Sequence, residues 1–151
     1  MADAPHILIV NAPFYEDITT ELMAGVTDVL DAAGATWDLE EVPGAFEIPA
    51  AIKFAHRAAQ AGTVGPYDGY AGLGCVIRGE TSHYDYVCEE SIRGLMNLTL
   101  DEGLAIVNGI LTVENRDQAW ARASRSDKNK GGDFGHGILS TIALKKKFGL
   151  A

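Results

Sequence analysis

Cysteine and long apolar runs are both scarce in this sequence. Its 151 residues include only two cysteines, Cys75 and Cys88, and no uninterrupted apolar segment of the length that crosses a bilayer. The polar, proline-containing start MADAPH lacks the pattern of a signal peptide. We therefore expect a cytoplasmic protein that does not bind membranes. Because both cysteines have apolar neighbours, we predict two buried thiols rather than a disulfide.

Basic residues are also few. Lys and Arg total 12 against 21 Asp and Glu, which gives a formal net charge of −9. A nucleic-acid-binding protein would normally present a basic face, so this composition argues against that class. The glycine-rich nucleotide motifs are missing too, since GLGCVIRG does not match G-x-G-x-x-G and there is no P-loop. A small anion would have to be held by local donors, for which the candidate arginines are Arg78, Arg116, Arg122 and Arg125.

Apolar, strand-like runs alternate with helix-length segments along the chain. Strands are predicted at 6–10, 36–42, 68–77 and 104–111, and helices at 16–34, 48–62, 84–103, 114–124 and 135–149. Strands and helices that alternate at this spacing favour a parallel sheet with helices on both faces.

The character of the individual strands supports this arrangement. Three of them are almost wholly apolar, as expected when both faces of a sheet are covered. The strand at 36–42 alternates polar and apolar residues, so we place it at an edge. The predicted fold is a flavodoxin-like three-layer α/β/α sandwich with a four-stranded parallel sheet, forming a single domain over residues 1–151.

Chemically versatile residues follow each predicted strand. In open parallel sheets, ligands bind outside the carboxyl ends of the strands. The loops at those ends carry Phe14, the segment 45–47, the cluster around His83, and Glu114 with Asn115. We expect all four loops to meet at one edge of the sheet and form one site.

The segment GETSH (79–83) predicts an anion site. Gly79 allows a ligand to approach the backbone closely, and the residues after it begin a helix whose first N–H groups have no partner within the helix. An ordinary helix cap, in which the hydroxyl of Thr81 or Ser82 bonds the first turn, explains the segment equally well. Both interpretations stay open at this point.

His83 lies in the first turn of the same predicted helix. Imidazole exchanges a proton near neutral pH, so its place beside a candidate anion site favours proton transfer over a structural role. A metal site is the weaker alternative, because Cys75, His83, Asp85 and Cys88 do not have the spacing of zinc ligands.

The segment VPGAFEIP (42–49) places Glu47 at the start of a helix. Its carboxylate could simply complement the helix dipole, or it could accept hydrogen bonds from substrate hydroxyls. Phe14 could offer a face to a planar ring, with packing in the core as the alternative.

Three segments, VPGAFEIP, GCVIRGETSHYDYV and GILTVEN, with a following NKG, resemble the signature segments of the 6,7-dimethyl-8-ribityllumazine synthase family. The resemblance extends from about residue 7 to residue 149. It implies an enzyme that condenses 5-amino-6-(D-ribitylamino)uracil, a ribitylaminouracil, with 3,4-dihydroxy-2-butanone 4-phosphate, a four-carbon ketose phosphate, and uses no cofactor or metal. A carrier of the same fold that binds a flavin or lumazine is the alternative, although such a carrier would need neither His83 nor Arg122.

The resemblance also implies roles for individual residues. Phe14 would stack on the pyrimidine, His83 would transfer protons, and Arg122 of a neighbouring subunit would bind the phosphate. The remaining expected substrate contacts are Ala45, Phe46 and Glu47 to the ribityl chain, Val76 and Ile77 to the ring, Gly79, Glu80 and Thr81 to the phosphate, Lys130 of the neighbour to the ribityl side, and Asn108 where an aromatic residue of the next subunit often closes the pocket. These roles imply a homo-oligomer with active sites between adjacent subunits. The polar stretch SRSDKNKGG (124–132) lacks the glycine-rich form associated with sixty-subunit capsids, so we expect a homopentamer.

Overall fold

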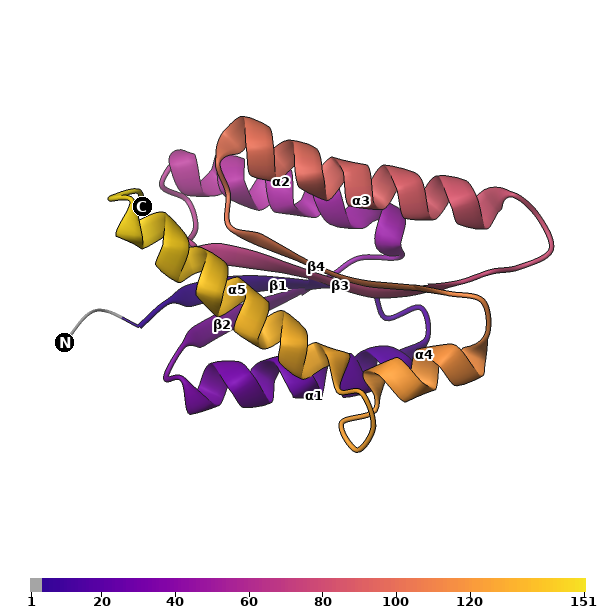
Figure 1. Cartoon of the computed structure of the whole chain (residues 1–151). Coiled ribbons are helices and arrows are strands. Elements are labelled where there is room, and N and C mark those ends of the chain that lie inside the picture. Colours follow the sequence, from indigo (N-terminus) through magenta and orange to yellow (C-terminus); the bar gives the residue numbers. More distant parts are fainter. Residues whose placement is uncertain (1–3) are drawn as a thin grey trace.

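A sheet of four parallel strands forms the centre of the protein in the computed structural model, which describes residues 4–151 (Figure 1). The strands are β1 (His6–Asn11), β2 (Thr36–Glu41), β3 (Gly69–Ile77) and β4 (Ile106–Val113). Their order across the sheet is β2-β1-β3-β4, and every neighbouring pair runs parallel. The predicted parallel sheet and the edge position of the 36–42 strand are both confirmed. β4 continues to Val113, two residues past the predicted end, because it pairs with β3 as far as Ile77.

Helices cover both faces of the sheet, which confirms the predicted three-layer sandwich (Figure 1). On one face lie the short 3-10 helix η1 (Ala45–Glu47), α2 (Ile48–Gln60) and α3 (His83–Glu102). On the other face lie α1 (Glu16–Ala32), α4 (Arg116–Ala123) and α5 (Lys130–Lys147). Within residues 4–151, none of the helices has both the length and the apolar character to span a membrane.

The core consists of two apolar layers, one on each face of the central strands. Successive residues of β1 point to opposite faces. Ile7 and Ile9 pack in one layer with side chains of α1 and α5, whereas Leu8 and Val10 pack in the other layer with side chains of α2 and α3. This double coverage explains why the strand sequence is apolar throughout.

The start of α5 differs from the prediction. The helix begins at Lys130, five residues before the predicted start at residue 135. Asn129 caps it, since its Oδ1 accepts the N–H of Gly132 at 3.3 Å. The two adjacent glycines disfavour a helix when judged from sequence alone. However, Gly131 lies so close to α1 that a Cβ there would clash with the backbone oxygen of Leu22. The glycine is therefore needed for helix packing, which a local sequence pattern does not reveal.

Another glycine brings the segment 45–47 to the tip of the sheet. A Cβ at Gly72 of β3 would lie 2.9 Å from Cγ2 of Ile48, so only glycine permits this approach of α2. As a result, η1 packs against both β3 and α3. The loop that follows β2 is thereby held over the carboxyl end of β3.

Candidate active site

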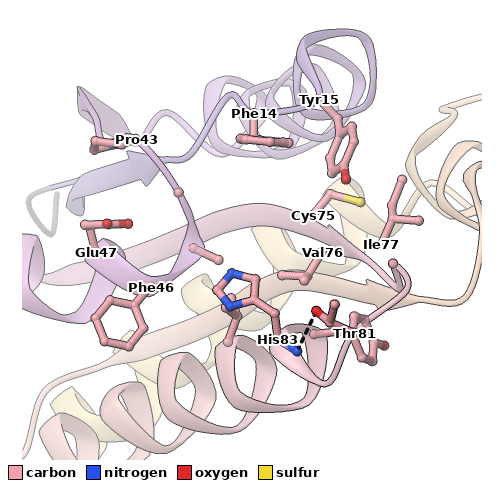
Figure 2. Close-up of a pocket in the computed structure, with 15 residues that line it drawn as sticks. Phe14, Tyr15, Pro43, Phe46, Glu47, Cys75, Val76, Ile77, Thr81 and His83 are labelled. Atoms are coloured by element: carbon pink, nitrogen blue, oxygen red, sulfur yellow. Dashed lines mark hydrogen bonds between the residues drawn. The ribbon is translucent and has the colours of Figure 1, made fainter.

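A cavity of about 570 Å³ opens at the carboxyl ends of the strands (Figure 2). It lies beside the ends of β1 and β3, where the chain switches from one side of the sheet to the other, which is the place where this class of fold binds ligands. The residues lining it are Phe14, Tyr15, Pro43, Gly44, Ala45, Phe46, Glu47, Cys75, Val76, Ile77, Gly79, Thr81, His83, Tyr84 and Val87. The structure thus brings nine of the predicted site residues together: Phe14, Ala45, Phe46, Glu47, Val76, Ile77, Gly79, Thr81 and His83.

Two phenylalanines give this cavity exposed aromatic faces. Phe14 is 71% exposed and Phe46 is 60% exposed. Phe14 contacts Tyr15 in a T-shaped arrangement, with ring centres 4.9 Å apart, and most of its surface stays open to a ligand. Packing of Phe14 in the core, the alternative considered above, is therefore wrong.

Glu47 also faces the cavity (Figure 2). It occupies the position before the first residue of α2, but its side chain makes no capping hydrogen bond. An interaction with the helix dipole needs no such bond, so that alternative stays open beside ligand binding. The carboxylate is an acceptor placed where hydroxyl groups of a ligand could donate to it.

The loop between β3 and α3 presents backbone donors. Thr81 Oγ1 accepts the N–H of His83 at 3.3 Å, so the predicted cap is present for that one group. The N–H groups of Gly79, Glu80 and Thr81 donate to no backbone or side-chain acceptor within residues 4–151. A Cβ at Gly79 would meet nothing within 4 Å, which leaves room for a ligand at this backbone. Capping and anion binding can therefore coexist in this segment, because they use different N–H groups.

The ring of His83 projects into the cavity from the first residue of α3 (Figure 2). Neither of its nitrogens is hydrogen-bonded to another group in the part of the chain that the structure describes. The imidazole is therefore free to exchange protons with a ligand.

Two other ionisable groups of the cavity are held in their neutral forms. Burial raises the pKa of the Cys75 thiol to about 11, and it also raises the pKa of the Tyr84 hydroxyl. Neither group supplies an anion at neutral pH, whereas the imidazole of His83 and the carboxylate of Glu47 are proton acceptors that face the cavity. Cys75 is buried as predicted, but Cys88 is only half-buried because α3 turns part of that face to solvent.

The expectation that a fourth loop joins the site is wrong. The Oε2 of Glu114 accepts a hydrogen bond from Arg78 Nε at 2.6 Å, and its backbone N–H donates to Gln118 Oε1 at 2.8 Å. Asn115 Oδ1 accepts the N–H of Gln118 at 2.9 Å and caps α4. Both residues stabilise the start of α4 and do not line the cavity.

Four predicted site residues lie outside the cavity of their own chain. Asn108 is exposed on β4, where its Oδ1 accepts the N–H of Ile110 at 3.1 Å. Lys130 lies at the start of α5, 3.3 Å from Asp133. The other two are Glu80, which is exposed beside the cavity, and Arg122 on α4.

The four candidate arginines differ in their partners. Arg78 pairs with Glu114 and Asp85, Arg116 with Asp17, and Arg125 with Glu21 and Asp28. The hydrogen bond from Arg116 lowers the pKa of Asp17, and those from the backbone and side chain of Arg125 lower the pKa of Glu21. Arg122 donates to the backbone oxygen of Gln118 at 3.1 Å and forms no ion pair with a carboxylate of residues 4–151. Its charge is therefore available to an anion.

Six of the lining residues were not among the predicted substrate contacts: Tyr15, Pro43, Gly44, Cys75, Tyr84 and Val87. Val87 could have been found, because it lies one helical turn after His83 and so shares its face of α3. A metal site was the weaker alternative for this region, and no group of three or more His, Cys, Asp and Glu side chains among residues 4–151 is arranged to hold a metal ion.

Comparison with known proteins gives a consistent result. Residues 4–146 match the sequence model of a family described as 6,7-dimethyl-8-ribityllumazine synthase. Proteins with that name from Bartonella bacilliformis and Agrobacterium fabrum are each 56% identical to this chain, with 96% of the chain aligned to 93% and 97% of the respective relative. The 6,7-dimethyl-8-ribityllumazine synthase 1 of Rhizobium meliloti is 54% identical, with 95% of this chain aligned to 94% of that protein.

Proposed function

Since the chain belongs to the 6,7-dimethyl-8-ribityllumazine synthase family, we propose that the cavity at the strand ends is where it carries out the reaction of that family. The protein condenses 5-amino-6-(D-ribitylamino)uracil with 3,4-dihydroxy-2-butanone 4-phosphate to give 6,7-dimethyl-8-ribityllumazine, phosphate and water, the penultimate step of riboflavin biosynthesis. The observation that carries the assignment of the site is the gathering of aromatic faces, a free carboxylate, free backbone N–H groups and His83 around one cavity.

The pyrimidine binds at the aromatic end of the cavity. Its ring stacks on Phe14, and Val76 and Ile77 contact it from the end of β3. The ribityl hydroxyls donate to Glu47 and reach the backbone of Ala45 and Phe46, because η1 places these groups together.

The phosphate binds at the loop between β3 and α3. The N–H groups of Gly79, Glu80 and Thr81 donate to its oxygens, and the start of α3 adds the positive end of a helix dipole. Arg122 of a neighbouring subunit supplies the compensating charge, since a guanidinium can bond two phosphate oxygens at once.

His83 transfers protons during the condensation. The aromatic amine of the pyrimidine attacks the ketone, water leaves as the Schiff base forms, phosphate is eliminated, and ring closure releases a second water. Amines and ketones react without a protein nucleophile, so most of the rate enhancement comes from holding the two substrates together. Acid–base help from His83 adds a smaller factor.

We propose that the protein acts as a homopentamer whose active sites lie between adjacent subunits. Three observations support this assembly. The cavity is open on the side of Phe14 and Phe46, and Arg122, Lys130 and Asn108 lie outside the cavity of their own chain. In addition, the α2–α3 layer exposes large apolar side chains, namely Phe54, Tyr86, Met96 and Leu100, of the kind that contacts between subunits usually bury.

Two experiments test this assembly. Analytical ultracentrifugation should give the mass of five copies of the 16.1 kDa chain, and a mass near sixty copies would contradict the pentamer. Mixed refolding of a Phe14→Ala variant with an Arg122→Ala variant should restore part of the activity, because some sites would then combine two intact halves. No recovery in mixed oligomers would show that each site is built from one chain.

An assay of the wild-type protein separates the enzyme from a carrier. The purified protein is mixed with both substrates, and the lumazine chromophore is followed by absorbance against a sample without protein, because the reactants also condense slowly on their own. An enzyme accelerates product formation, whereas a carrier binds added lumazine and leaves the rate unchanged. The cytoplasmic location expected from the sequence remains a prediction, which cell fractionation would test.

A further inference from the structure

Arg78 lies where β3 ends and the loop to α3 begins. Its Nε donates to Glu114 Oε2 at 2.6 Å, and its Nη1 donates to Asp85 Oδ1 at 3.3 Å. Its guanidinium carbon also lies 4.3 Å from the centre of the Tyr84 ring. Glu114 follows β4, whereas Asp85 and Tyr84 belong to the first turn of α3. One side chain therefore connects three elements around the segment 79–82.

The segment 79–82 has few other restraints. It is exposed to solvent, and a Cβ at Gly79 would meet nothing within 4 Å. At its end, Thr81 Oγ1 accepts the N–H of His83, and the Ser82 oxygen accepts the N–H of Asp85 at 3.0 Å. Neither bond holds Gly79 or its neighbour in place. A loop that binds an anion through backbone N–H groups gains affinity when it is ordered before the anion arrives, because ordering it on binding costs entropy.

We propose that Arg78 is a positioning residue for phosphate recognition, which holds the segment 79–82 in the conformation that presents its N–H groups to the phosphate. This inference rests on the proposed function, in which that segment binds the phosphate. Arg78 acts through the loop and not on the phosphate, because its Nε and Nη1 already donate to Glu114 and Asp85. The contact of Arg78 with Tyr84 has a second effect: it orients the Tyr84 ring, which lines the cavity.

The exposure of this network separates positioning from a general contribution to stability. The side chains of Arg78, Asp85 and Glu114 are 40%, 59% and 56% exposed. Exposed ion pairs contribute little to global stability, so their loss should act on the order of the loop and leave the fold intact. Arginine is also the residue suited to the task. Its planar group can bond two carboxylates and lie over a ring at once, whereas the ammonium of lysine is a single point of charge.

The test is the steady-state kinetics of Arg78→Gln in the full-length protein. We expect the KM for the ketose phosphate to rise about fivefold or more, while the KM for the ribitylaminouracil changes less than about twofold. The inhibition constant of inorganic phosphate, used as a competitive probe, should rise by the same factor as the KM for the ketose phosphate. Arg78→Lys should restore part of the loss, because it keeps one of the two ion pairs.

Arg93→Gln is the matched control. Arg93 is also an exposed arginine, and it pairs with Glu90 on α3, away from the loop. This variant removes the same charge and should leave both KM values unchanged. If Arg78→Gln does not fold, Glu114→Gln can replace it. This substitution, at an exposed position, removes the shorter of the two ion pairs and should also raise the KM for the ketose phosphate.

The inference is overturned if the phosphate inhibition constant stays within about twofold of wild type in the folded variants, or if both KM values rise together. Its failure is distinct from failure of the proposed function. If only this inference fails, the wild-type protein still forms lumazine. If the proposed function fails, the wild-type protein forms none above the rate without protein.

Discussion

Replacement of Phe14 by alanine should weaken binding of the pyrimidine and have little effect on the fold. The Phe14 ring is 71% exposed, so its removal forfeits little buried apolar area. The edge contact with Tyr15, at 4.9 Å between ring centres, is the main interaction lost within the chain. An aromatic pair of this kind contributes about 1 kcal/mol. For a chain of this size, that corresponds to a fall of about 2–4 °C in the thermal midpoint.

Loss of the stacking contact between Phe14 and the pyrimidine should have a larger effect on substrate binding. Stacking of a nucleic-acid base on an aromatic side chain contributes about 1–3 kcal/mol. At about 1.4 kcal/mol for each factor of ten, the KM for the ribitylaminouracil should rise between about fivefold and about 150-fold. The KM for the ketose phosphate should change much less, because the phosphate loop lies at the other side of the cavity. Initial rates of lumazine formation, measured with each substrate varied in turn, give both constants.

Phe148→Ala is the matched control for this experiment. Phe148 is 73% exposed and directly follows α5, whose C-terminal end lies at the opposite end of the molecule from the loop between β3 and α3 (Figure 1). Its replacement removes the same ring and should leave both constants at their wild-type values. An unchanged KM for the pyrimidine in Phe14→Ala, or an equal rise in both variants, would refute the stacking argument.

Three further predictions concern proton transfer, packing and thiol reactivity. His83→Ala should lower kcat by no more than about 10²-fold. Arg122→Ala should lower kcat/KM more strongly, because it raises the KM for the ketose phosphate. Complete loss of steady-state activity in His83→Ala would contradict this ranking. Gly131→Ala should destabilise the protein by about 1–3 kcal/mol in urea denaturation, because the added Cβ would clash with α1. Gly137→Ala, whose Cβ would lie 3.4 Å from Val107, should be neutral or stabilising. Equal effects of the two substitutions would show that the contact between α1 and α5 is not tight. Burial raises the pKa of Cys75 to about 11, so only about a thousandth of this thiol should be thiolate at pH 8. Its alkylation by iodoacetamide, followed by mass spectrometry, should therefore be slow at pH 8 and accelerate as the pH approaches 11. Rapid alkylation at pH 8 would contradict the burial of this thiol.

The parts of the fold that were predictable from sequence depend on local patterns. The strands stand out because double coverage of the sheet makes them apolar throughout, and the edge strand stands out because it alternates. The position of the site followed from the same pattern, since the carboxyl ends of parallel strands meet at one edge. Phe14, Glu47 and His83 were found in this way, each in the loop after a different strand.

The parts that were not predictable depend on contacts between distant segments. Glu114 looked like a site residue, but its carboxylate bonds Arg78 across 36 positions of sequence, and its neighbour Asn115 caps α4. The early start of α5 depends on the approach of Gly131 to α1, which no local pattern shows. Arg122 was predicted as a site residue from the likeness of key segments to a known family. Spacing could not have suggested that role, because this arginine lies outside the cavity of its own chain.

The most direct test of the central claim is a crystal structure of the wild-type protein soaked with 6,7-dimethyl-8-ribityllumazine and inorganic phosphate. We expect the lumazine ring to lie on Phe14, and the phosphate to accept hydrogen bonds from the N–H groups of Gly79 and Thr81 and from Arg122 of an adjacent copy. Binding of the lumazine away from the strand ends, or a phosphate that no neighbouring guanidinium reaches, would contradict the claim that two chains build each site.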